Sequence, residues 1–215
     1  MGTICKYIYR HFYTKLFPDY HAELKKAVGD CKSLLDVGCG SSSPIKLFSK
    51  NLYSVGVDMF EPYIKKSKTR KIHSEYYKIG ALDIGKVFDD ESFDCVFAGD
   101  LIEHLDKKDG LSLLKMMERV AKEKVIIFTP NGFLPQNERD GNKLQIHKSG
   151  WSIEEMRSMG YDVIGINGWR PLRGSDTAIR FKPKFFWRII SDMTQFFVRN
   201  KPKYACQILC IKNIG

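Results

Sequence analysis

Short apolar runs alternate along the chain with longer segments in which apolar residues recur at helical spacing. The apolar runs predict strands at residues 33–37, 53–57, 76–79, 93–98, 124–128, 161–166 and 204–211. Helical spacing and end signals predict helices at residues 5–29 (with a break at Pro18), 44–50, 61–71, 106–120 and 151–159. One face of the 106–120 helix holds Leu111, Leu114, Met117 and Val120. Because strands and helices alternate, the pattern favours an α/β fold with a parallel sheet covered on both faces.

The end of the chain departs from this alternation. A charged insert at residues 168–203 separates the last two strands, so we expect these strands to pair antiparallel at the edge of the sheet. Within the insert, residues 183–199 predict an amphipathic helix whose apolar face consists of Phe186, Ile189, Ile190, Met193 and Phe197. We expect this face to pack on the parent domain; the alternative is an interfacial helix that contacts lipid.

Length and composition narrow the class of protein. A chain of 215 residues suits one globular domain with a lid. No apolar run approaches the ~20 residues of a membrane span, and the N-terminus has no apolar signal-peptide core. The six cysteines are scattered without a C-x-x-C pair, which indicates neither a zinc knuckle nor a disulfide framework. A reduced, cytoplasmic setting is therefore expected.

The positive charge is unevenly distributed. The formal net charge is +10, and the whole excess lies in residues 1–32 and 168–203. Both segments are also rich in aromatic residues. A single charged run is usually a solvated surface. Two basic and aromatic segments outside the central pattern favour an anionic partner or substrate, and they permit a peripheral contact with a membrane surface.

A glycine turn, Gly38-Cys39-Gly40, follows the 33–37 strand and precedes the next helix. Glycines at the carboxyl end of a strand let the backbone approach a ligand closely, and open α/β sheets bind nucleotides at this place. Asp58 ends the second strand, about 20 residues after Gly38, where a carboxylate can accept hydrogen bonds from both ribose hydroxyls. The sequence therefore predicts a nucleotide site at this end of the sheet.

With these residues the chain resembles the class I S-adenosylmethionine (SAM) methyltransferases, in a type 11, ubiquinone-pathway-like branch, over residues 33–166. Residues 34–40, Leu-Leu-Asp-Val-Gly-Cys-Gly, are similar to the first motif of that family. The resemblance implies SAM as the cofactor, with Asp58 on the ribose, Met59 beside the adenine and Asp83 on the adenine amino group. The cofactor-binding residues that it implies are Asp36, Gly38, Cys39, Gly40, Asp58, Met59, Asp83, Ile84, Asp100 and Leu101. For Asp36 and Asp83, helix capping or turn formation is the alternative.

The same resemblance implies the fold in more detail. It implies a doubly wound, mostly parallel seven-stranded sheet of order 3-2-1-4-5-7-6, in which strand 7 is antiparallel. Residues 1–32 would form an N-terminal helical cap, and residues 33–215 the SAM-binding methyltransferase domain, with the 168–203 insert as a helical lid. Both basic segments would then border the entrance for the substrate.

The segment after the fourth strand carries a second group of candidate residues. Asp100, Glu103 and His104 have a spacing similar to the metal-binding E-x-x-E-H of ubiquinone-pathway O-methyltransferases and small-RNA 2′-O-methyltransferases. With His147 downstream, two carboxylates and two imidazoles could hold a divalent cation that orients and acidifies a hydroxyl. His104 and His147 are thus the candidate catalytic residues. Alternatively, Glu103 and His104 cap the next helix, and His147 acts alone as a base or hydrogen-bond donor, or is a plain loop residue.

We therefore expect a SAM-dependent methyltransferase acting on oxygen of a small-molecule, glycan or lipid-precursor acceptor with anionic character. The segment Ala98-Gly99-Asp100-Leu101 stands where base N-methyltransferases carry a proline-containing motif, which disfavours base N-methylation. An RNA 2′-O-methyltransferase is an alternative that the basic charge permits. A SAM-binding protein without transferase activity is the other.

Overall fold

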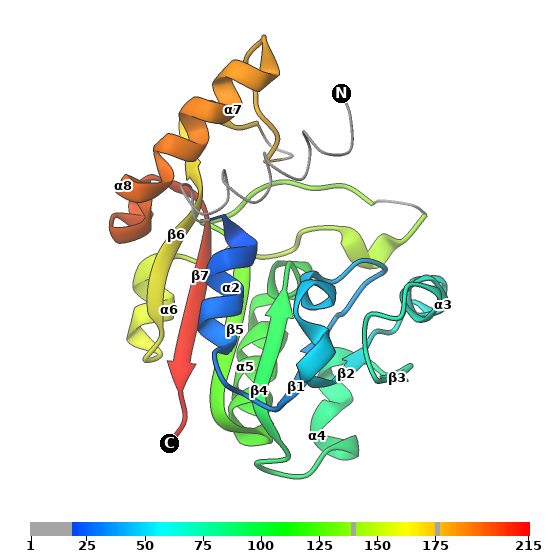
Figure 1. Ribbon diagram of the computed structural model, residues 1–215. Helices are drawn as coiled ribbons and strands as arrows, with labels where there is room; N and C mark the ends of the chain where they lie inside the picture. The colour runs from blue at the N-terminus through cyan, green and yellow to red at the C-terminus, as the bar shows by residue number, and fades with distance from the viewer. Residues whose placement is uncertain (1–18, 139–140, 175–176) are drawn as a thin grey trace.

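The computed structural model describes residues 19–138, 141–174 and 177–215. They form a seven-stranded sheet with helices on both faces (Figure 1). The strands are β1 (Ser33–Val37), β2 (Tyr53–Val57), β3 (Glu75–Tyr77), β4 (Phe93–Gly99), β5 (Ala121–Pro130), β6 (Asp162–Trp169) and β7 (Ala205–Asn213). The first part of the helix expected at 5–29, with its break at Pro18, lies outside the described residues.

The strand order is β3-β2-β1-β4-β5-β7-β6, which confirms the expected order. β1 pairs in parallel with β2 and β4, and β4 pairs in parallel with β5. β7 runs antiparallel between β5 and β6, so the predicted antiparallel pair at the edge is also confirmed. Parallel pairing brings the carboxyl ends of β1, β2, β4 and β5 to one end of the sheet, which is where open α/β sheets bind ligands.

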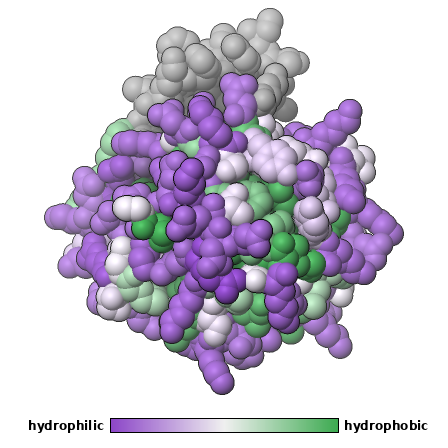
Figure 2. Space-filling view, turned by 90° about the horizontal axis from the view of Figure 1, so that it is seen from below, coloured by the Kyte–Doolittle hydropathy of each residue, from purple (hydrophilic) through white to green (hydrophobic). Residues whose placement is uncertain are grey.

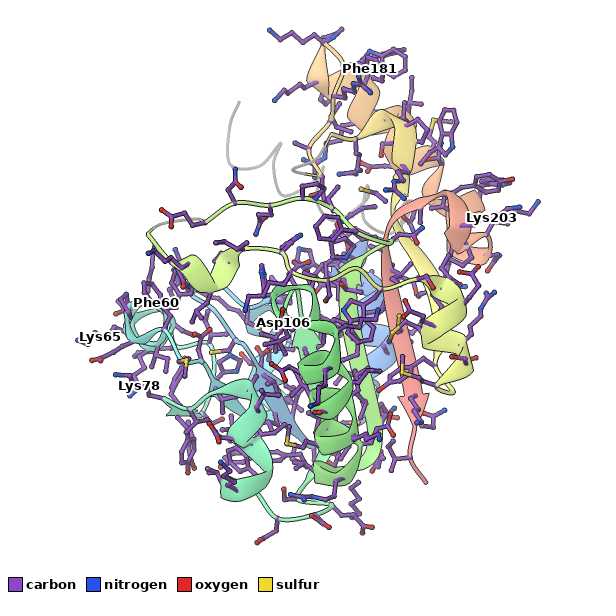
Figure 3. All side chains as sticks on the ribbon, turned by 180° about the vertical axis from the view of Figure 1, so that it is seen from behind. Phe60, Lys65, Lys78, Asp106, Phe181 and Lys203 are labelled. Atoms are coloured by element: carbon purple, nitrogen blue, oxygen red, sulfur yellow. The ribbon has the colours of Figure 1, made fainter. Side chains whose placement is uncertain are left out.

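Helices cover both faces of this sheet. They are α2 (Tyr20–Val28), α3 (Glu61–Thr69), α4 (Ile84–Val87), α5 (Lys107–Val120), α6 (Ile153–Ser158), α7 (Lys184–Met193) and α8 (Gln195–Asn200). α5 lies along one face with α4 and α6 beside it (Figure 3), and α2 lies along the other (Figure 1). α8 is joined to α2 by an ion pair between Arg199 Nε and Glu23 Oε1 (2.7 Å). None of the described helices combines the length and apolar character needed to cross a membrane.

The apolar core is divided by the sheet into two layers. The layer under α5 includes Leu35, Val96, Val125, Leu114 and Met117. The layer under α2 includes Leu24, Val28, Leu34, Cys95 and Ile126. Strands buried on both faces are nearly continuous apolar runs in the sequence, and this is why the short runs located them correctly.

The segment 44–50 was expected as a helix, and it is helical but of the 3₁₀ type. It forms two short pieces, Pro44–Leu47 and Ser49–Asn51. Ser43 does cap the first turn, because its Oγ accepts a hydrogen bond from the backbone N of Ile45 (3.2 Å). The chain re-enters the sheet only a few residues later, and the tighter turn suits such a short piece better than an α-helix does.

The buried face of α5 differs from its prediction at one position. Leu114, Met117 and Val120 are buried as expected. Leu111, however, is 40% exposed, and Leu113 is fully buried in its place. Leu111 lies three residues before Leu114, and Leu113 lies four residues before Met117, so both leucines have helical spacing to a buried residue. Periodicity alone therefore does not show which of the two leucines is buried.

The helix expected at 183–199 has the opposite orientation to the predicted one. Its residues buried against β6 are Ser191, Gln195 and Val198. The apolar face expected to pack on the domain is exposed instead, since Phe186, Met193 and Phe197 are 52%, 57% and 49% exposed. The prediction that this face packs on the parent domain is therefore wrong.

Two glycines of β6 explain this orientation. A Cβ at Gly165 would lie 2.2 Å from the carbonyl oxygen of Val198, and one at Gly168 would lie 2.3 Å from that of Ser191. The helix backbone thus lies too close to the strand for a side chain at either glycine position. This close approach also lets Gln195 bond to the strand backbone, because its Nε2 donates to Gly165 O (2.8 Å) and its Oε1 accepts from Gly168 N (3.0 Å).

We predict that Gly165→Ala destabilises the protein by about 1–3 kcal/mol, because the added methyl group forces α8 away from β6. The free energy of unfolding in urea would measure this change. The matched control is Gly85→Ala, where the nearest atoms belong to the end of the flexible Arg119 side chain. An equal effect of both substitutions would contradict the close approach of α8.

Candidate functional site

The glycine turn lies at the carboxyl end of β1 and has the backbone that a ligand-binding turn requires. Gly38 and Gly40 both have positive φ angles, 72° and 58°, a conformation that side chains disfavour. The backbone N–H groups of Gly38 and Cys39 both donate to Val57 O (2.8 and 2.9 Å), which joins the ends of β1 and β2. A Cβ at Gly38 would lie 2.8 Å from Leu101 Cδ1, so this candidate residue packs directly against the turn.

Asp58 follows β2 and is hydrogen-bonded to the same turn. Its carboxylate accepts from Gly40 N (2.9 Å) and from Phe60 N (2.7 Å). Burial raises the pKa of Asp58, and the hydrogen bonds from the backbone oppose this rise. An oriented carboxylate with lone pairs beyond these two bonds can accept from further hydroxyls.

Three candidate residues line the neighbouring region with different exposure. Met59 is 56% exposed, which is unusual for a large apolar side chain and suits contact with a flat ligand. The Asp83 side chain is 45% exposed, pairs with Lys86 Nζ (2.7 Å) and makes no capping hydrogen bond to α4. Ile84 is fully buried in the core, so only its backbone is available to a ligand.

Asp36 and Cys39 are buried beneath the turn. Asp36 Oδ2 lies 3.2 Å from His73 Nε2, and both side chains are almost fully enclosed. His73 Nδ1 lies 3.3 Å from Ser54 Oγ. Burial raises the pKa of the Cys39 thiol, which therefore stays protonated, leaving the backbone as the polar surface of this residue. No pattern in the sequence identified His73 as the neighbour of Asp36.

Asp100 follows β4 and adopts a positive φ of 48°, a conformation in which Asp is several-fold enriched. Its Oδ1 accepts a hydrogen bond from Gln207 Nε2 (3.3 Å), and its backbone N donates to Phe128 O (2.8 Å). Tyr20 from α2 stacks on Phe128 at 3.9 Å. Burial raises the pKa of Tyr20, and the Asp100 carboxylate raises it further.

Tyr20 and Gln207 were not predicted as site residues. Tyr20 lies in the N-terminal helix, far from every motif in the sequence, and offers no local signal. Gln207 does offer one: it is a polar residue within the apolar run of β7, and it is 5% exposed. A buried polar residue in a strand requires partners, and here Gln207 donates to Asp100 and accepts from Asn167 Nδ2.

Glu103 lies in the turn after β4 and is buried at 2% exposure. Its Oε2 accepts a hydrogen bond from Thr129 Oγ1 (3.0 Å), at the end of β5. Its backbone carbonyl accepts from Lys148 N (2.8 Å) and Ser149 N (3.1 Å). Burial raises the pKa of Glu103 well above its usual range, and the nearby Asp100 carboxylate adds to the rise.

The side chains of Glu103, His104 and His147 meet at this place. One ligand atom of each lies within 4.8 Å of the others, and the two imidazole rings are 4.7 Å apart. Three of the four predicted metal ligands are thus brought together, while Asp100 is outside this group and contacts Gln207. Such a set of one carboxylate and two imidazoles suits a divalent transition-metal ion.

The tautomers of the two histidines follow from their neighbours. His147 Nδ1 faces the carbonyl oxygen of Leu134, and His104 Nδ1 faces that of Ile146 (3.3 Å). A carbonyl oxygen can only accept, so each Nδ1 carries a hydrogen, and in the neutral imidazole the lone pair is then on Nε2. This arrangement gives an imidazole the form required of a base or of a metal ligand.

A cavity of about 460 Å³ opens next to this cluster. Its lining residues are Pro130, Asn131, Leu134, Arg170, Arg173, Gly174, Arg180 and Cys206. Leu134 connects it to the cluster, because its carbonyl oxygen is the partner of His147. Among the described residues no carboxylate lies within ion-pair distance of Arg170 or Arg180. The cavity therefore has a positive lining.

A comparison of the sequence with protein-family models gives a match over the central strands of the sheet. Residues 35–129 match the family model described as a methyltransferase domain. No curated protein gives a significant match. A SAM-dependent methyltransferase from Archaeoglobus fulgidus is similar in structure, with a TM-score of 0.57 and 19% identity over 95% of this chain and 99% of that one. A putative methyltransferase from Bacillus halodurans has a TM-score of 0.58 and 14% identity over 91% and 98%.

The sequence match and the fold agree with each other. The matched region begins in β1 and ends in β5, so it contains the glycine turn, Asp58 and Glu103. At these identities, the similar structures show the fold alone, and it is the seven-stranded fold with the antiparallel β7. Residues 35–129 therefore form a methyltransferase domain, and the chain as a whole has the fold of the SAM-dependent methyltransferases.

Proposed function

We propose that this methyltransferase transfers the methyl group of SAM to an oxygen atom of an anionic small-molecule, glycan or lipid-precursor acceptor. The observation that carries this proposal is the arginine-lined cavity beside His147. Three guanidinium groups suit a phosphate or carboxylate, because Arg binds such groups with paired hydrogen bonds.

The residues around the glycine turn fit SAM. The positive-φ glycines leave backbone close to the ligand, and Asp58 can accept from the ribose hydroxyls while it holds Gly40 and Phe60. Met59 offers an exposed apolar surface for the adenine, and Asp83 an exposed carboxylate for its amino group. When bound, SAM supplies an activated methyl group on a positively charged sulfur. The carboxyl groups on this side of the site match that charge.

Arg173 and Arg170 are held in place by the protein, which prepares them for an anion. Arg173 Nη1 donates to Thr177 O (2.8 Å), while its Nε is buried without a hydrogen-bond partner. Arg170 Nη1 donates to Asn131 O (3.1 Å). Burial lowers the pKa of Arg173, which means that its charge is poorly solvated and would be stabilised by an anion.

A hydroxyl acceptor needs help with its proton, and the histidine cluster can give it. An imidazole with its lone pair on Nε2 can remove the proton directly as a general base. Alternatively, Glu103, His104 and His147 hold a divalent cation that lowers the pKa of the bound hydroxyl. Both versions place the acceptor oxygen near His147, with its anionic group toward Arg170, Arg173 and Arg180.

The two alternative functions are less well supported by these contacts. A cavity of about 460 Å³ holds one small group, whereas an RNA strand requires a longer positive groove with stacking aromatic residues. A protein that only binds SAM does not need a histidine cluster beside an anion site.

We predict that Asp58→Ala lowers the affinity for SAM by about tenfold or more, because hydrogen bonds to a charged acceptor contribute about 1.5–3 kcal/mol each. Isothermal titration calorimetry would measure the dissociation constant. The matched control is Asp162→Ala, at the exposed start of β6, which should bind SAM like the unsubstituted protein. Unchanged affinity in Asp58→Ala, with normal circular dichroism, would rule out the assigned role.

We predict that His147→Ala lowers turnover by about a hundredfold while SAM affinity stays the same, because a positioned base or metal ligand acts on the acceptor alone. His21→Ala, an exposed histidine of α2, is the control. Dialysis against EDTA distinguishes the two versions: loss of activity that Mg²⁺ or Mn²⁺ restores indicates a cation, and unchanged activity indicates a base. A His147→Ala variant with full turnover would contradict both.

We predict that, in an extract of the source cells, label from methyl-labelled SAM enters an organic-soluble or small aqueous product that an anion-exchange resin retains. Arg180→Glu should raise KM for this acceptor by about tenfold or more, because it reverses a charge at the cavity. SAM affinity should not change. Arg157→Glu, on the exposed side of α6, makes the same change in net charge as a control.

Three results would count against this acceptor class. Label found in RNA would support the first alternative, and its affinity should then fall steeply with salt. SAM binding without label in any fraction would support the second. An equal KM for Arg180→Glu and Arg157→Glu would show that the arginine cavity does not bind the acceptor.

A further inference from the structure

The outward side of α7 and α8 exposes large apolar side chains over a continuous stretch of chain. The exposed residues are Phe181, Phe185, Phe186, Met193, Phe196 and Phe197, with exposed fractions between 40% and 63%. In Figure 1, α7 projects beyond the end of the sheet, away from the body of the protein. The opposite end of the molecule shows mostly hydrophilic side chains with smaller apolar areas (Figure 2). Exposed apolar patches of this kind mark binding surfaces.

The exposure is built into the packing rather than being a loose arrangement of the helices. The inner side of the helices is fixed on β6 by the hydrogen bonds of Gln195 and by the bond from Trp169 N to Thr194 Oγ1 (2.8 Å). Because Gly165 and Gly168 hold the backbone close, α7 cannot rotate its apolar side inward without losing these contacts. A polar inner side and an apolar outer side are the reverse of an ordinary surface helix.

Basic residues surround the exposed rings. Between residues 177 and 204 the sequence carries seven basic residues and a single acidic one, Asp192. Lys201 Nζ lies 4.9 Å from the centre of the Phe197 ring, and Lys203 Nζ lies 4.8 Å from that of Tyr204. In Figure 3, Phe181 and Lys203 both lie on the outside of this region.

We propose that this surface docks on an anionic membrane. We call it the aromatic-basic face, and its rings and methionine are Phe185, Phe186, Met193, Phe196 and Phe197. Lys201 lies over the Phe197 ring, Lys203 is exposed nearby, and Lys182, Lys184 and Arg188 are exposed on the other sides of the α7 segment. Rings and methionine enter the boundary between headgroups and acyl chains, and each Lys or Arg near the surface is attracted to anionic lipid. The face would hold the enzyme against the surface from which a lipid-linked acceptor is presented.

Charge argues against the other occupants of this face. The N-terminal segment 1–18 contains basic residues but no acidic residue, so it offers no complement to the lysines. A second copy of the chain would bring two basic faces together, and like charges repel. RNA would match the charge and could stack on the phenylalanine rings, but Met193 and the half-buried Ile189 and Ile190 add aliphatic surface to the same helix, which suits acyl chains rather than bases.

The test is flotation of the full chain with phosphatidylcholine vesicles that contain or lack phosphatidylglycerol. We expect binding to the anionic vesicles alone, weakened but not abolished by high salt, because rings insert while charges are screened. The variant F186S/M193S/F197S and the variant K182E/K184E/R188E should each lower the partition coefficient by about tenfold or more. The matched controls, Leu111→Ser and Lys115→Glu, change an exposed leucine and an exposed lysine of α5 and should bind normally.

Five other outcomes would overturn the proposal. In the vesicle assay they are equal binding to both kinds of vesicle, no binding to either kind, and full binding by either triple variant. The fourth is a dimer, detected by light scattering, that the F186S/M193S/F197S substitutions dissociate, and the fifth is an RNA oligonucleotide that binds this face while vesicles do not. Unchanged SAM affinity and circular dichroism verify that the variants are folded, since all substituted residues are exposed. The result does not depend on the identity of the acceptor.

Discussion

The candidate site depends on the hydrogen bonds of one buried residue, Glu103. Its carboxyl group binds Thr129 at the end of β5, and its carbonyl binds the backbone of Lys148 and Ser149. These contacts fasten the loop that follows β5 to the turn that follows β4, and so bring His147 to His104. The same loop supplies Asn131 and Leu134 to the arginine cavity. Glu103 thus holds in place both the histidine cluster and the loop that forms one wall of the arginine cavity.

The parts of the fold that could be predicted from the sequence are those that depend on local chemistry. Buried strands are apolar runs, and the turn at Gly38 to Gly40 requires glycine for its own backbone, so both leave local signals. Tyr20 and His73 reach the site through packing between segments far apart in the sequence, and no local pattern marks them. The prediction of which side of α7 faces inward failed for a different reason. Periodicity shows which residues share a face of the helix. Which face is turned inward is decided by the close approach of Gly165 and Gly168 in β6 to the backbone of α8 and α7.

The segment 168–203 contributes to both the arginine cavity and the aromatic-basic face. Its first part contributes Arg170 and Arg173 to the cavity, and its later part forms the aromatic-basic face. Because α8 is held on β6 and joined to α2 by the Arg199–Glu23 ion pair, the two surfaces are fixed relative to each other. An acceptor anchored in a membrane would therefore meet the cavity from a defined direction.

Carboxylates and guanidinium groups belong to different parts of the candidate site. Asp58 is bonded to the glycine turn, while the arginines line the cavity that Leu134 joins to the histidine cluster. Burying carboxylates raises the pKa of Asp58 and costs stability, so a positively charged ligand there recovers part of that cost. Burial likewise lowers the pKa of Arg173, whose counter-charge Asp192 lies 4.0 Å away, so an anion in the cavity would stabilise it further. Under the proposed function, a cationic methyl donor would satisfy the first need and an anionic acceptor the second, and the histidine cluster adjoins the arginine cavity through Leu134.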